Sequence, residues 1–287
     1  MQKKTIILVL AVLAMALALV ASLAGVILED GGSPYVFTSL GGQNVEIYGG
    51  EGLYQNDSVV KAVTFIGFNW ANLLVVLPVL ILAVALYWRG QFRGQILLGA
   101  IFTYFAYNYL IGVMGNAFNG MFLVWTGLFS AGLFGLALVL TDINLLALPE
   151  KLKPDFPRKS LAIYAFILGL FLPVLYLIDI IGAYASAKPP ATLETYTTLE
   201  LAALEIGLMA PLHLVAGRLL WQRNAWGYIL VSLLAFVASM TFISLSIAYG
   251  LLYLSFQRSS LVDVIRFIVF AVIASGFSLA AFKRVKG

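Results

Sequence analysis

The sequence predicts an all-α integral membrane protein with eight transmembrane helices. Apolar residues make up 62% of the chain and charged residues 10%, whereas soluble domains average about 45–50% and about 25%. Apolar stretches of roughly twenty residues recur, which is the length a helix needs to cross the hydrocarbon layer. The short alternating segments that are typical of a membrane β-barrel are absent. One stretch also occurs twice, which indicates an internal repeat.

We expect eight spans, each apolar on all sides, over residues 5–28, 60–88, 95–114, 120–141, 161–184, 199–220, 227–251 and 261–282. The first run follows Lys3 and Lys4 and is longer than the core of an ordinary signal peptide. We therefore interpret it as an uncleaved span. The alternative is a signal peptide that covers residues 1–24, because Ser22, Leu23 and Ala24 resemble a cleavage site.

The repeated stretch covers residues 72–97 and again residues 205–230, without a gap. Seven of the 26 aligned residues are identical, namely Pro78/Pro211, Ala83/Ala216, Leu86/Leu219, Trp88/Trp221, Gly94/Gly227, Ile96/Ile229 and Leu97/Leu230. The copies lie four spans apart, so they share one orientation, and the halves would be related by an axis along the membrane normal. We expect a first four-helix half over residues 1–159, including a loop at 29–60, and a second over 160–287.

Basic residues are distributed unequally between the two sides of the predicted bundle. Thirteen of the 17 lysines and arginines lie on the side of the N-terminus, and the other four are Lys61, Lys188, Arg258 and Arg266. This positive-inside bias predicts that both termini are cytoplasmic and that the protein lies in the cell membrane. We therefore assign the net charge of +4 to membrane orientation and expect no nucleic-acid partner.

The loop at residues 29–60 is the longest polar segment and is rich in glycine. Residues 43–48 lie between two glycine pairs and include Val45, Ile47 and Tyr48, which is typical of a short strand in a hairpin. The glycines do not follow a strand in a GxGxxG pattern and no Walker lysine comes after them, so they do not indicate a phosphate loop. We expect an extracytoplasmic loop with a short β-hairpin.

The sequence contains no motif that indicates an enzyme. It has no cysteine, which excludes disulfides, thiolate metal sites and cysteine nucleophiles. HExxH, GxSxG and paired intramembrane aspartates are also absent. The one histidine, His213, cannot supply a three-ligand zinc site with the single carboxylate that is near it in sequence. We predict no metal, no cofactor and no catalytic site.

Polar side chains gather in the outer half of the predicted spans, where an ionisable group costs roughly 2.5–3.5 kcal/mol on insertion scales. The candidate ligand-binding residues are Asn69, Asn72, Asn108, Asp179, Glu205 and Arg266. One interpretation is structural, with Arg266 neutralising Asp179 or Glu205 and the amides bonding between helices. The other is a pocket open to the outside, which would bind a small ligand, an ion or a lipid head group.

The repeat gives the second interpretation its support. Asn72 and Glu205 occupy equivalent positions in the two copies, and each lies six residues before a proline, Pro78 or Pro211. Proline removes a helix hydrogen bond, so both spans are expected to bend at the same depth, as is a third span at Pro173.

Several phrases resemble a family of prokaryotic multi-pass membrane proteins of about eight spans that has no known activity. They are Gly52-Leu53-Tyr54 with Asp57-Ser58, Gly67 with Asn69, Leu77-Pro78, Arg93-Gly94, Tyr107-Asn108-Tyr109, Phe118-Asn119, Pro211 and Trp226-Gly227-Tyr228. The resemblance covers most of residues 50–235 and implies the architecture alone. An aspartate is usual in that family where this chain has Asn69, which puts a functional role for that position in doubt.

Two function hypotheses follow. The first is a protein that binds or transports a small molecule, ion or lipid head group through an outward-facing polar pocket. The second is a non-catalytic assembly factor or sensor that docks a partner through the loop at 29–60.

Overall fold

The computed structural model describes residues 3–286. It confirms the all-α class and, within these residues, eight helices long and apolar enough to cross a membrane. Every predicted span agrees with an observed one to within three residues at each end. The helices are α1 (Lys3–Ile27), α2 (Val59–Ala71) continuing through η1 (Asn72–Val76) into α3 (Leu77–Trp88), α4 (Phe92–Gly115), α5 (Phe122–Thr141), α7 (Arg158–Ser186), α8 (Glu200–Leu204) continuing through η3 (Glu205–Met209) into α9 (Ala210–Trp221), α10 (Ala225–Leu254) and α11 (Leu261–Phe282).

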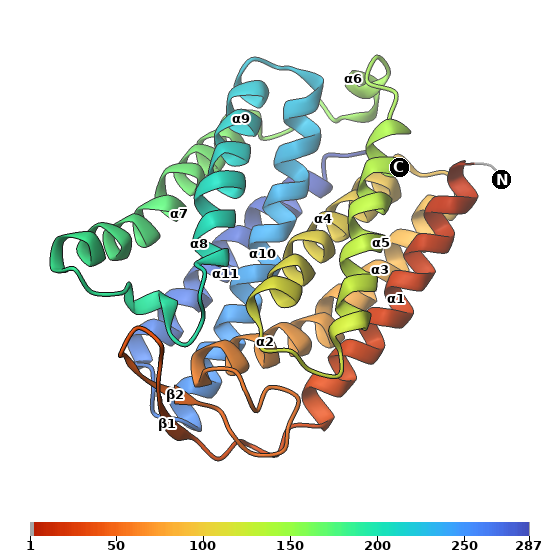
Figure 1. Cartoon of the computed structure of the whole chain (residues 1–287). Coiled ribbons are helices and arrows are strands. Elements are labelled where there is room, and N and C mark those ends of the chain that lie inside the picture. The colour runs from red at the N-terminus through yellow and green to blue at the C-terminus, as the bar shows by residue number, and fades with distance from the viewer. Residues whose placement is uncertain (1–2, 287) are drawn as a thin grey trace.

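Both ends of the chain lie at one end of the bundle, here called the terminal end (Figure 1). Contacts between distant segments fix this arrangement, because Lys4 Nζ donates to the Trp88 carbonyl at 2.9 Å and Arg93 donates to the Val285 carbonyl at 2.7 Å. The short helix α6 (Leu148–Lys151) lies at the same end (Figure 1).

A β-hairpin lies at the opposite end, here called the hairpin end (Figure 1). Strands β1 (Tyr35–Thr38) and β2 (Asn44–Ile47) pair antiparallel. Two long-range contacts hold the hairpin on the helices: Arg258, which follows α10, pairs with Glu46 at 2.5 Å, and Gln43 Nε2 donates to the Pro190 carbonyl at 3.1 Å. The hairpin therefore connects the α7–α8 and α10–α11 loops.

Helices α4 and α10 form the centre of the bundle. In the most apolar segment of each helix, 78% of the α4 residues and 61% of the α10 residues are buried, compared with 22% of the α11 residues. Helix α10 packs against α2, α4, α9 and α11. The approach of α2 to α10 depends on Gly67, since a Cβ there would lie 2.5 Å from the Ser244 carbonyl oxygen. A helix pair that close needs a residue without a side chain at the contact.

Two spans contain a π-helical turn at matching places. In η1 the Leu77 N–H bonds to the Asn72 carbonyl, and in η3 the Ala210 N–H bonds to the Glu205 carbonyl. Pro78 and Pro211 follow immediately, and because proline supplies no N–H, the helix widens just before it. The sequence predicted bends at these prolines; the structure adds a π-turn before Pro78 and Pro211, and α7 runs through Pro173 without an interruption.

Candidate functional site

Asn72 opens the first π-turn and is satisfied by tyrosines of α4. It is 2% exposed. The Tyr104 hydroxyl donates to its Oδ1 at 2.9 Å, and its Nδ2 donates to the Tyr109 hydroxyl at 3.2 Å. Both polar atoms of this amide are thus used inside the bundle, so Asn72 acts as an interhelical hydrogen-bonding residue.

Glu205 opens the second π-turn and is only partly satisfied. It is 8% exposed, and its Oε1 accepts a hydrogen bond from Tyr107, which α4 also supplies. Its Oε2 is buried and has no hydrogen-bond partner among residues 3–286. A buried polar atom without a partner costs about 1–3 kcal/mol, more when it is charged. This acid is therefore a candidate ligand-binding group.

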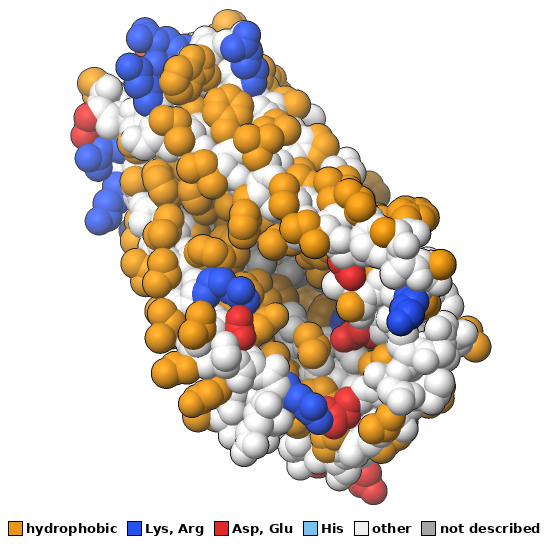
Figure 2. Space-filling view, turned by 90° about the vertical axis from the view of Figure 1, so that its left-hand side faces the viewer, with side chains coloured by type: hydrophobic (Ala, Val, Ile, Leu, Met, Phe, Trp, Pro, Cys, Tyr) orange, Lys and Arg blue, Asp and Glu red, His pale blue; other side chains and the backbone are white. Residues whose placement is uncertain are grey.

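The surroundings of Glu205 are open where those of Asn72 are closed. Helix α7 buries side chains from Leu161 to Gly169 but none from there to its end at Ser186. Beyond Gly169 it diverges from the bundle (Figure 1). Figure 2, which views this side of the molecule, shows a hollow with largely hydrophobic walls and acidic and basic side chains around it.

Aromatic side chains of three helices lie close to one another near Glu205. Tyr176 of α7 is half-buried and lies within electrostatic reach of both Glu205 and Tyr249 of α10. Tyr249 packs on Phe267 of α11, with ring centroids 4.3 Å apart. We call the space between Tyr176, Glu205, Tyr249 and Phe267 the lateral opening. It combines aromatic side chains with the buried acid Glu205 and with the Arg266–Asp263 ion pair, whose guanidinium lies 5.0 Å from the centre of the Phe267 ring.

The other predicted site residues have structural partners. Asn69 is 4% exposed and donates to the Tyr54 hydroxyl at 2.7 Å. Asn108 is 6% exposed on α4, next to Tyr107. Asp179 accepts hydrogen bonds from the backbone N–H groups of residues 191 and 192, both at 3.0 Å, and so fixes the short 3₁₀ helix η2 (Ala191–Leu193).

Arg266 does not neutralise either acid for which the sequence suggested it. Within residues 3–286 it pairs with Asp263, one helical turn away on α11, at 2.8 Å. Of the six predicted residues, Asn72 and Glu205 each bond to tyrosines of α4, the helix that carries Asn108. Asn69 lies one helical turn before Asn72 and bonds to Tyr54, while Asp179 and Arg266 have contacts of their own.

Sequence reasoning missed a charged cluster at the hairpin end. Asp57 is fully buried and accepts hydrogen bonds from the Ala117 N–H and the Tyr196 hydroxyl, both at 2.8 Å. Burial raises the pKa of the Asp57 carboxyl, and these hydrogen bonds partly oppose that rise. Lys61 pairs with Glu200 and lies 4.3 Å from the centre of the Tyr196 ring.

The same cluster contains Glu194, to which the Ser58 hydroxyl donates. Burial raises the pKa of Glu194, and the bond from Ser58 opposes it. One local signal was available: Ser58 precedes the second span, and its hydroxyl accepts from the Lys61 N–H at 3.2 Å as an N-cap. The partners come from a loop more than a hundred residues away, which no local pattern indicates.

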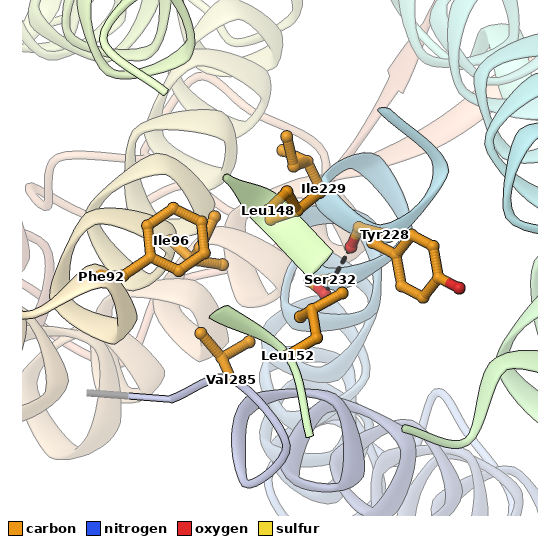
Figure 3. Close-up of a pocket in the computed structure, with 8 residues that line it drawn as sticks. All are labelled: Phe92, Ile96, Leu148, Leu152, Tyr228, Ile229, Ser232 and Val285. Carbon is orange, nitrogen blue, oxygen red and sulfur yellow. Dashed lines mark hydrogen bonds between the residues drawn. The ribbon is translucent and has the colours of Figure 1, made fainter. Parts of the chain in front are cut away.

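A small cavity at the terminal end offers little to a polar ligand (Figure 3). Apolar side chains from α4, α6 and α10 form most of its wall. The Ser232 hydroxyl bonds to the Tyr228 carbonyl of its own helix at 2.7 Å, and the Tyr228 hydroxyl points away from the cavity (Figure 3). We therefore place the candidate site at the lateral opening.

His213, the one histidine, bonds through Nδ1 to the Met209 carbonyl of its own helix at 2.8 Å. Within residues 3–286, no group of three or more histidine, aspartate or glutamate side chains is placed to hold a metal ion.

Comparisons of the chain with protein-family models, with curated proteins and with solved structures find no match. The family resemblance read from the sequence therefore stays a prediction.

Proposed function

We propose that this chain is a membrane protein that binds or carries a small amphipathic molecule, which enters the lateral opening from the lipid. The observation that carries the proposal is the buried Oε2 of Glu205, which has no partner among the described residues although it lies on a deformed helix beside an opening. A ligand that donates a hydrogen bond or brings a positive charge would remove that cost.

The shape of the opening supports a ligand with an apolar part. Phe267 and Phe270 of α11 line up toward α10, packing on Tyr249 and Phe242 at 4.3 and 5.3 Å between ring centroids. Pockets for small molecules are mostly hydrophobic with a few placed polar groups. An apolar tail against these rings and a polar end at Glu205 would use both features.

The orientation follows from the basic residues. We place the terminal end in the cytoplasm and the hairpin end outside the cell membrane, because most lysines and arginines lie at the terminal end. The lateral opening then faces the outer leaflet.

We also propose that the two halves of the chain, residues 1–159 and 160–287, arose by duplication. The π-turns η1 and η3 begin at equivalent positions of the two sequence copies, and α3 and α9 begin and end at equivalent positions too. In transporters, repeated halves commonly enclose the binding site at a helix discontinuity, and Glu205 lies at such a discontinuity.

Binding of a photoactivatable lipid analogue to the purified protein in nanodiscs tests the proposal. We expect labelling of α7, α10 or α11 next to the opening, reduced several-fold in Glu205→Gln. The matched control is Asn72→Asp, which changes the equivalent position of the closed half and should leave labelling at the opening unchanged. Labelling spread evenly over lipid-facing helices, and equal in all three proteins, would contradict the proposal.

A second function, docking of a protein partner, is supported by the hairpin. Strand β1 exposes apolar side chains along its length, with Val36 67% and Phe37 48% exposed, and the neighbouring Leu40 is 95% exposed. Exposed apolar strands pair with other chains. Replacing Val36 and Phe37 by serine should abolish co-purification of a partner without lowering the melting temperature; co-purification that is unaffected would remove this function.

A further inference from the structure

No salt bridge among residues 3–286 includes Glu205, although Arg266 lies at the lateral opening, 5.0 Å from the centre of the Phe267 ring. Arg266 forms an ion pair with Asp263 on α11 at 2.8 Å, and Lys61 forms an ion pair with Glu200. His213 lies on the same helix as Glu205 but two turns farther along, and its Nδ1 bonds to the Met209 carbonyl. Each of these cationic or titratable groups therefore has a partner other than Glu205.

An isolated carboxylate in a membrane is costly, so its charge must be removed by a proton or balanced by a cation. The single hydroxyl of Tyr107 bonds to Oε1 and leaves Oε2 free. A neutral hydroxyl ligand would supply one hydrogen bond. A ligand with a positive charge would supply both a hydrogen bond and the missing counter-charge, which is the stronger combination in a low-dielectric site.

The tyrosines around Glu205 favour a cation over other ligands. Tyr107 bonds to Glu205, and Tyr176 lies within electrostatic reach of both. Tyr249 lies within electrostatic reach of Tyr176 and so extends the aromatic group toward α10. Aromatic faces attract ammonium groups, and the attraction grows when the site is shielded from water. An anionic head group would meet the acid and gain nothing from the rings.

We infer that the lateral opening recognises a protonated amine carried on an aliphatic chain, with the ammonium group at Glu205 between the tyrosines and the chain against α10 and α11. This inference rests on the proposed function and specifies its ligand class. The apolar walls of the hollow in Figure 2 give the chain a surface to contact. The amine can belong to a free alkylamine or to a lipid head group such as ethanolamine.

The test compares three probes of equal chain length, decylamine, decanol and decanoate, by equilibrium binding to the full chain in nanodiscs at pH 7, where the amine is charged. We expect decylamine to bind roughly tenfold or more tightly than decanol, since an ion pair and a cation–π contact are added. Decanoate should bind weakest. Glu205→Gln should abolish the preference for the amine while decanol binding persists.

A second variant distinguishes a loss of ligand binding from a loss of folding. Tyr176 is half-buried on the part of α7 that buries no side chain, so Tyr176→Leu should leave the melting temperature unchanged. It should lower decylamine affinity several-fold and leave decanol affinity unaltered.

Mass spectrometry of the lipids that the protein retains from a mixture of phosphatidylethanolamine and phosphatidylglycerol then shows whether the amine belongs to a lipid or is free. Enrichment of phosphatidylethanolamine assigns the amine to a lipid, and its absence together with decylamine binding assigns it to a free amine.

The outcomes separate this inference from the function on which it rests. Equal binding of decylamine and decanol, or a preference that survives in Glu205→Gln, would overturn the amine and leave amphiphile binding in place. Failure of all three probes and of the photoactivatable lipid would remove the proposed function itself.

Discussion

The two π-turns of this protein begin at equivalent positions of a repeated sequence. The residues that open them differ in their hydrogen-bond partners and in the helix that packs beside them. Asn72 is enclosed: α1 buries side chains over its whole length, from Ile7 to Gly25, and packs against α2, α3 and α5. Glu205 is buried as well, and α7 packs against its π-turn, but α7 buries none of its side chains beyond Gly169. The amide that opens the first π-turn is fully satisfied, while the acid that opens the second keeps one carboxylate oxygen without a partner among residues 3–286.

This difference shows that a helix deformation alone does not make a binding site. The same π-turn before a proline is part of the packed core in one half and borders a hollow in the other. What separates them is the neighbouring helix and the side chain that opens the turn: an amide that two tyrosines satisfy, or an acid that one tyrosine satisfies only in part. We assign a stabilising role to the satisfied amide of Asn72 and a binding role to the partly satisfied acid of Glu205.

The largest effect should come from the contact between α2 of the first half and α10 of the second. In Gly67→Ala the new Cβ would lie 2.5 Å from the Ser244 carbonyl oxygen, so α2 must move away from α10. We expect a loss of stability near the upper end of the about 1–3 kcal/mol typical of overpacked cores. The matched control is Gly250→Ala on α10, where a Cβ meets nothing within 4 Å. That variant should be neutral or slightly more stable. Thermal unfolding in detergent measures both, and equal melting temperatures would contradict the account.

A smaller effect should distinguish Asn72 from Glu205. Asn72→Leu removes two interhelical hydrogen bonds, each worth on average about 0.6 kcal/mol and at most about 1.7 in membrane proteins. Glu205→Gln keeps an acceptor for Tyr107 and removes the unpaired acid, so it should leave the melting temperature unchanged or raise it. Destabilisation by Glu205→Gln equal to that of Asn72→Leu would make both residues structural.

The sequence predicts the fold more completely than it predicts the site. Composition and run length are sufficient for eight spans because hydrocarbon imposes a minimum helix length whatever the tertiary contacts are. The equivalence of Asn72 and Glu205 was visible in the repeat. The partner of Arg266 was not visible in the sequence. Arg266 could bond within its own helix or across the bundle, and in the structure it bonds to Asp263 of its own helix. The divergence of α7 has no local sequence signal either, since its apolar surface suits lipid as well as protein.

The smallest effect concerns the contact at the hairpin end between the loop before α2 and the loop between α7 and α8. Burial raises the pKa of Asp57 and Glu194, so the folded protein binds their protons more tightly than the unfolded chain does. The contribution of these two acids to stability should therefore be greatest in acid and should fall as the pH rises from about 4 through the raised pKa values. Lys61, Glu200 and Tyr196 are the other titratable groups in contact there. The double variant Asp57→Asn, Glu194→Gln should flatten the dependence of melting temperature on pH over that window; an unchanged slope would show that other groups cause it.

An experimental density map of the protein in nanodiscs that contain phosphatidylethanolamine tests the central contrast most directly. We predict elongated non-protein density between α7 and α11 that ends at Glu205, with protein side chains alone around Asn72. A map in which α7 packs along α11 to its end and Glu205 Oε2 bonds to a protein side chain would contradict it.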